Sequence, residues 1–71
     1  MKVFIQLNIK RIQLISGLTQ HELADRAGIS PSYLSDLERG KHANPGVEII
    51  CRLALALSCT LDDLVSYREE E

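Results

Sequence analysis

Apolar residues at the start of the chain change from strand-like alternation to the spacing of a helix. This change predicts a helix from about residue 6 to residue 15, which Gly17 ends. Thr19, followed three residues later by Glu22, has the spacing of a capping box, in which the hydroxyl and the carboxylate each accept a hydrogen bond from a free backbone N–H. We therefore expect a second helix over about residues 20 to 27.

Turn-forming residues delimit a third helix in the middle of the chain. Gly28 stands where a left-handed residue would turn the backbone, and Ser30 and Pro31 supply the N-cap and the first position of a helix. We expect this helix to run to about Arg39, because Gly40 follows it.

The rest of the chain, from residue 41 to residue 71, predicts a loop and two more helices. The loop covers residues 41 to 46, and from Val47 the apolar residues have helical spacing over three turns. Thr60 and Asp63 repeat the capping-box spacing and open a short last helix. We expect residues 68 to 71 to form an acidic tail that frays.

The length and composition fit one small helical domain. The chain has 71 residues, one Phe and no Trp, with many Leu, Ile and Ala residues. We expect an all-α domain over residues 1 to 67. Neither a signal peptide nor an apolar run of about 18 residues occurs in the sequence, so we expect a cytoplasmic protein without a membrane partner.

The cysteines do not suggest a disulfide or a metal site. Cys51 and Cys59 are eight residues apart, which on one helix is roughly 12 Å and too far for a disulfide. We interpret both as small buried thiols. A zinc site that added His21 and His42 would lack any known ligand spacing, so we expect no metal and no cofactor.

Charge is unevenly distributed along the chain. The net charge is −2, but residues 1–60 carry a net +2 and residues 61–71 carry a net −4. The acidic balance of the whole chain is therefore a weak argument against a nucleic-acid partner, since the acid is concentrated at the C-terminal end.

The second and third predicted helices have the pattern of a helix-turn-helix. They are short, a four-residue turn with a glycine separates them, and the residues that would face inward are apolar: Leu23, Ala24, Ala27, Ile29, Leu34 and Leu37. Burial of Leu34 and Leu37 leaves Pro31, Ser32, Ser35 and Asp36 on the outer face of the third helix. A short polar face of this kind can enter a DNA major groove, which is about 12 Å wide.

The segment LTQHELADRAGISPSYLSDLERGK resembles the helix-turn-helix of the Cro and repressor family of bacterial and phage regulators, and the resemblance continues through ANPGVEIICRLALALSCTLDDL. It covers roughly residues 7 to 65 and is closest to the SinR-like branch. The resemblance implies a compact five-helix, lambda-repressor-like DNA-binding domain with its helix-turn-helix at residues 19–39. It also implies a homodimer on a two-fold operator, with the third helix contacting the bases.

Carried over residue by residue, the resemblance implies that Gln20 bonds a phosphate and that Lys41 and Asn44 also touch the backbone. We expect nine residues to form the DNA interface: Gln20, Pro31, Ser32, Tyr33, Ser35, Asp36, Arg39, Lys41 and Asn44. One departure concerns Gln13, which stands where many relatives have an arginine that pairs with the glutamate ending the third helix. We therefore expect Glu38 to have only a neutral partner.

The last helix and its flanks carry more apolar residues than one short helix can bury. We expect a dimer interface made of Leu61, Leu64, Val65 and Tyr67. No set of nucleophile, base and orienting group can be proposed together, so we expect no enzymatic activity. Two alternatives to a dimeric regulator are an antitoxin that also binds a toxin through Leu14 and Ile15 or the tail, and a protein-interaction module without DNA binding.

Overall fold

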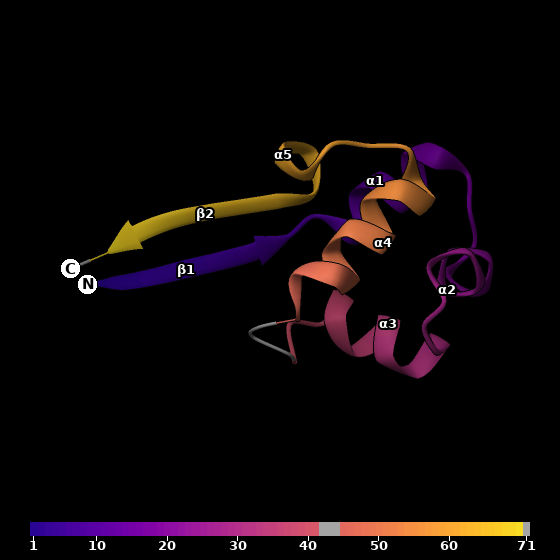
Figure 1. Cartoon of the computed structure of the whole chain (residues 1–71), viewed down its shortest axis with the longest axis horizontal. Helices are drawn as coiled ribbons and strands as arrows, with labels where there is room; N and C mark the ends of the chain where they lie inside the picture. The colour runs from indigo at the N-terminus through magenta and orange to yellow at the C-terminus, as the bar shows by residue number, and fades with distance from the viewer. Residues whose placement is uncertain (42–44, 71) are drawn as a thin grey trace.

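The computed structural model describes residues 1–41 and 45–70, and within these ranges the chain forms five helices and two strands (Figure 1). The elements follow one another as β1 (Lys2–Leu7), α1 (Ile9–Ser16), α2 (Gln20–Ala27), α3 (Pro31–Glu38), α4 (Val47–Leu57), α5 (Leu61–Leu64) and β2 (Val65–Glu70). The five predicted helices are thus present, each within a few residues of its expected position.

The all-α prediction is wrong at both ends of the chain, because β1 and β2 pair as a two-stranded antiparallel sheet. The register runs from Lys2 opposite Glu70 to Leu7 opposite Val65. The first helix consequently begins at Ile9 rather than near residue 6. The expected frayed tail is also wrong for residues 68–70, which form the end of β2. We call the paired strands the terminal ribbon.

Side-chain caps from Thr19, Ser30 and Thr60 fix the starts of α2, α3 and α5, as the sequence predicts. Thr19 and Glu22 form a capping box at α2, with the Glu22 backbone N–H 3.1 Å from Thr19 Oγ1 and the Thr19 backbone N–H 3.0 Å from Glu22 Oε1. Thr60 and Asp63 form the same arrangement at α5. Gly28 ends α2 with a φ of +70°, a left-handed conformation that strains any side chain but glycine.

The hydrophobic core lies between the helices. Among the residues that the structure describes, ten are buried in it, and the fully buried large side chains are Ile9, Leu23, Leu34, Leu53 and Leu64. Cys51 and Cys59 are half-buried free thiols, rather than fully buried as expected. Burial, followed by the nearby Asp63 carboxylate, raises the pKa of the Cys59 thiol.

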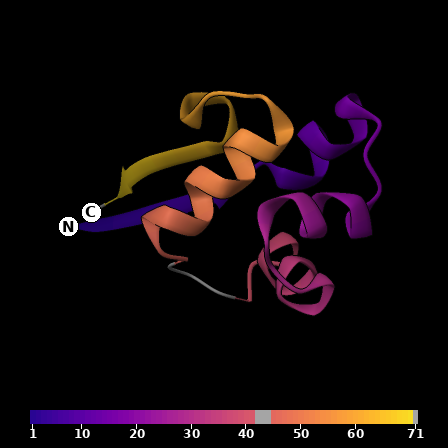
Figure 2. The ribbon, with the colours of Figure 1, turned by 45° about the vertical axis from the view of Figure 1, so that its right-hand side comes forward.

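The molecule is elongated, with dimensions of 38 × 21 × 19 Å, because the terminal ribbon projects from the helices. Both views place the ribbon at one end of the molecule and α2 toward the other, with the two chain termini together at the ribbon tip (Figures 1 and 2). Among the helices within residues 1–41 and 45–70, none has the length and apolar character needed to cross a membrane.

Candidate nucleic-acid interface

Helices α2 and α3 are held together by the turn between them and by apolar side chains on their inner faces. The Ile29 backbone N–H donates to the Ala24 carbonyl oxygen at 3.0 Å, which closes the turn after Gly28. Leu34 and Leu37 are buried, as the sequence predicts. Burial of this side of α3 turns its opposite side outward, toward solvent.

The outer side of α3 lines a shallow hollow with a volume of about 330 Å³. The hollow gathers six of the nine residues expected at the DNA interface, namely Gln20, Pro31, Ser32, Ser35, Asp36 and Arg39. Ser30 holds the start of α3 in place, because its Oγ accepts a hydrogen bond from the Tyr33 backbone N–H at 3.1 Å. Residues from two helices therefore converge on one polar surface.

A second hollow of about 360 Å³ adjoins the first and is lined by Lys10, Gln20, Ser35, Glu38 and Arg39. Gln20, Ser35 and Arg39 line both hollows. Lys10 comes from α1 and was not expected at this surface. Its sequence position gives no indication of it, because the approach of α1 to α2 and α3 depends on packing between residues distant along the chain.

Gln20 is oriented by a hydrogen bond across the helix-turn-helix. Its Nε2 donates to Glu38 Oε2 at 3.1 Å, which links the first residue of α2 to the last residue of α3. The neutral partner expected for Glu38 is therefore Gln20 in this structure. Gln13 is buried on α1, and within the described residues neither Gln13 Oε1 nor Glu38 Oε1 has a hydrogen-bond partner.

Asp36 is accompanied by a positive charge at the same surface. Lys41 Nζ lies 3.8 Å from Asp36 Oδ1, and the Lys41 backbone N–H donates to the Asp36 carbonyl oxygen at 2.9 Å. Both side chains are partly open to solvent, so the ion pair contributes little to stability. Its electrostatic effect is to offset the repulsion that Asp36 would exert on a phosphate.

Two other expected interface residues are placed differently. Tyr33 is half-buried and packs against the hydrophobic core, so only part of its side chain faces the surface. Asn44 lies outside the described residues.

The capping box at the start of α2 also has an electrostatic consequence. The Thr19 backbone N–H, and after it the Thr19 side chain, hold the pKa of Glu22 below its ordinary value by hydrogen bonding to its carboxylate. The negative charge of Glu22 therefore stabilises the N-terminus of α2, where the helix dipole is positive. This arrangement fixes the turn of helix that carries Gln20.

The surface expected to form a dimer is present in part. Leu61 and Tyr67 are exposed and Val65 is half-buried, and these three residues line an apolar hollow of about 240 Å³ together with Val47, Ile50 and Asp62. Leu64 does not belong to this surface. It is 0% exposed in the core, because α5 is a single turn that points this residue inward, so its expected interface role is wrong.

Comparison with known proteins agrees with this geometry. The helix-turn-helix family model HTH_3 matches residues 9–64. An HTH-type transcriptional regulator named y4dJ, from Sinorhizobium fredii (strain NBRC 101917 / NGR234), is 40% identical over 70 residues, covering 99% of this chain and 90% of that protein. SinR of Bacillus subtilis (strain 168) is 31% identical over 62 residues, which cover 87% of this chain but only 56% of SinR.

Solved structures show the same fold. The structure of SinR in complex with DNA superposes with a TM-score of 0.72 at 31% identity, over 76% of this chain and 86% of that one. The restriction-modification controller protein C.AhdI from Aeromonas hydrophila gives a TM-score of 0.73 at 31% identity, over 78% of this chain and 82% of that one. This chain therefore belongs to the helix-turn-helix family HTH_3 of Cro/C1-type transcriptional regulators.

Proposed function

We propose that this regulator is a sequence-specific DNA-binding protein that acts as a homodimer on a two-fold operator. The observation that carries the proposal is the polar surface on the outer side of α3, where six expected DNA-binding residues line one hollow. In this account the N-terminal half of α3 enters the major groove. The likeness to a structure of SinR in complex with DNA supports DNA as the partner.

The residues divide into two roles. Ser32 and Asp36 lie on the outer side of α3 and face the bases, where Asp36 can accept a hydrogen bond from a cytosine amino group. Gln20, Arg39 and Lys41 contact the phosphates, and Lys10 extends this set toward α1. The basic set is small, so the electrostatic part of the affinity is modest.

The dependence of DNA affinity on salt tests this proposal directly. A dimer with few basic contacts per subunit should bind with a slope of log K against log salt on the order of −3 to −6. Lys41→Ala should make the slope shallower by about one unit per subunit. Lys2→Ala removes the same charge from the ribbon tip and serves as the matched control. A slope near zero for the unmodified protein would support an interaction module without DNA binding.

A second candidate function is an antitoxin that binds both DNA and a toxin. Leu14 and Ile15 are exposed apolar side chains on α1, and that helix has no basic residue in its last turn. A protein partner on this surface would shield both side chains from water. Co-purification of the chain with the product of a neighbouring gene, lost in Leu14→Ser with Ile15→Ser, would favour this function.

A further inference from the structure

The two faces of the terminal ribbon differ in character. Side chains alternate along each strand, and residues directly opposite in the register share a face. One face holds Lys2, Phe4 and Gln6 with their partners Glu70, Arg68 and Ser66. The other, which we call the apolar ribbon face, holds Val3, Ile5 and Leu7 with their partners Glu69, Tyr67 and Val65.

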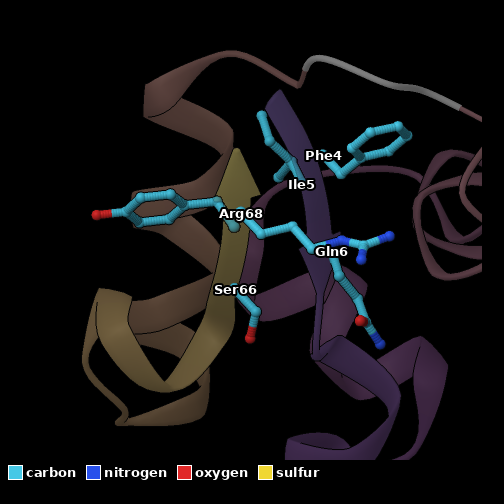
Figure 3. A pocket seen from close by; sticks show the side chains of 6 residues that line it. Phe4, Ile5, Gln6, Ser66 and Arg68 are labelled. Atoms are coloured by element: carbon cyan, nitrogen blue, oxygen red, sulfur yellow. The ribbon is translucent and has the colours of Figure 1, made fainter. Parts of the chain in front are cut away.

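The first of these faces is mainly polar, and its aromatic residue is partly shielded by a neighbouring side chain. The Arg68 guanidinium carbon lies 5.1 Å from the centre of the Phe4 ring, a cation–π contact, and its side chain reaches across the ribbon toward β1 (Figure 3). Ser66 Oγ accepts a hydrogen bond from Asn8 Nδ2 at 3.0 Å. Phe4 and Ile5 point in different directions from β1 in the same view. Phe4 is the one large apolar side chain of this face, and it is 43% exposed with the Arg68 cation over its ring.

The apolar ribbon face is open to solvent. Val3 is 54% exposed, Ile5 is 48% exposed and Tyr67 is 77% exposed. The surface continues through Val65 and Tyr67 into the apolar hollow that Leu61 and Val47 line, and both of these are exposed as well. An isolated two-stranded ribbon is only marginally stable in water, so a face of this composition is expected to be covered.

We propose that a second copy of this chain covers the apolar ribbon face, so that the paired chain ends form the centre of the dimer interface. This inference rests on the proposed homodimer and identifies the surface through which the two subunits meet. It extends the expected dimer interface from α5 and its flanks to strand β1.

The size of the surface fits a second copy. The five exposed side chains at Val3, Ile5, Val47, Leu61 and Tyr67 present apolar area on the order of 400 Å². A standard interface buries roughly 800 Å² per partner, of which about 57% is apolar, or roughly 450 Å². The patch therefore supplies close to the apolar area that each subunit of a stable dimer needs.

The distribution of charge and the position of the ribbon also favour a second copy on the apolar ribbon face. Among the described residues of the apolar ribbon face, the charged residue is Glu69, which lies near the tip of the ribbon. At the opposite end of the surface, Asp62 lines the apolar hollow. Charged residues at the rim and apolar residues at the centre are typical of interfaces between proteins. The ribbon projects from one end of the molecule, and α2 and α3 lie toward the other end in both views, so a partner seated on the ribbon leaves the proposed DNA-binding surface free (Figures 1 and 2).

The test compares two double variants of β1 by sedimentation equilibrium over a range of concentrations. Val3→Thr with Ile5→Thr alters the apolar ribbon face and keeps residues of high strand propensity. Phe4→Thr with Gln6→Thr places two threonines on the opposite face of the same strand and serves as the control. We expect the first variant to raise the dimer dissociation constant at least about tenfold and the second to change it less than about threefold. Equal effects of both variants, or none from the first, would overturn the inference.

Tyr67→Thr extends the test to β2. Because it leaves the sequence of β1 unchanged, it controls for local unfolding of β1 in the first variant. It should weaken the dimer in the same direction, with the helical circular dichroism unchanged. A dimeric wild-type protein with normal dimerisation in both the Val3/Ile5 and Tyr67 variants would overturn the ribbon interface but leave the proposed homodimer standing. A wild-type chain that stays monomeric at hundreds of micromolar would contradict both, while DNA binding, measured separately, would stand or fall independently.

Discussion

Gln20 and Glu38 join the two ends of the helix-turn-helix through one hydrogen bond, with Gln20 Nε2 3.1 Å from Glu38 Oε2. The bond uses one of the two amide hydrogens of Gln20 and leaves the other able to donate to a phosphate. Glu38 thereby holds a neutral donor at the surface that we propose binds DNA. The side chain of Gln20, which we propose contacts a phosphate, is therefore already oriented before DNA binds.

Gln20→Ala should weaken binding to all DNA sequences alike, because a phosphate contact carries no sequence information. We expect a loss of about 1 kcal/mol per subunit, measured by fluorescence anisotropy on several operators. Gln6→Ala removes the same side chain from the terminal ribbon and should leave affinity unchanged. A change in base preference for Gln20→Ala would show that this residue contacts a base instead.

Asp36→Asn and Ser32→Ala should each change which base is preferred at one position, with discrimination altered by about 1 to 3 kcal/mol.

Lys41→Ala should lower affinity for every sequence. The loss should be larger in the wild-type background than in the Asp36→Asn background, since Lys41 lies 3.8 Å from the Asp36 carboxylate and offsets its charge. A double-mutant cycle on matched operators measures this coupling. If Asp36→Asn raised affinity equally for every sequence, Asp36 would only repel the backbone.

Local signals in the sequence were enough to predict the helices and most of the helix-turn-helix surface. The caps at Thr19, Ser30 and Thr60 each depend on residues three positions apart, so they can be recognised without the fold. The turn at Gly28 is equally local. These features place the outward residues of α3 correctly.

The features that the sequence did not predict correctly depend on contacts between residues that are distant along the chain. The strand-like alternation at residues 3–7 became interpretable as β1 only with its partner β2, more than fifty residues away. The burial of Leu64 follows from how the single turn of α5 packs, which apolar spacing alone does not reveal. Lys10 joins Gln20 and Arg39 at the proposed DNA-binding surface for the same kind of reason, since its place depends on the position of α1.

Thr19→Ala should lower the free energy of unfolding by about 1 kcal/mol at neutral pH, because it removes the N-cap of α2. Urea denaturation followed by circular dichroism measures the change. Ser35→Ala, in the interior of α3, is not an N-cap and controls for loss of a hydroxyl. Equal stability of Thr19→Ala and wild type would mean that the capping box does not persist in solution.

The same variant predicts a pH dependence. The folded pKa of Glu22 lies below its ordinary value of 4.5, so its stabilising effect is present above that pH and is lost as the pH falls through the folded pKa. Thr19→Ala should return the pKa of Glu22 toward its ordinary value. The difference in stability between wild type and variant should therefore shrink as the pH falls below 4.5. A difference that stays constant with pH would contradict the role of Glu22.

Leu64 and Leu61 should respond differently to the same substitution, although they lie on one helical turn. Leu64→Ala should cost about 2 to 5 kcal/mol of stability, because Leu64 is fully buried in the core. Leu61→Ala should leave monomer stability nearly unchanged and weaken the dimer, because Leu61 is exposed. Thermal denaturation and sedimentation separate the two effects. Similar losses of stability would contradict the distinction between core and interface.

Selection of bound DNA from a random double-stranded pool is the most direct test of sequence-specific binding by this protein, since it requires no knowledge of the operator. We expect enrichment of one two-fold symmetric site, with half-sites about 10 base pairs apart or a multiple of that spacing. We also expect that Ser32→Ala changes the preferred base within each half-site. Failure to enrich any sequence motif, with the folded protein present at micromolar concentration, would contradict sequence-specific DNA binding.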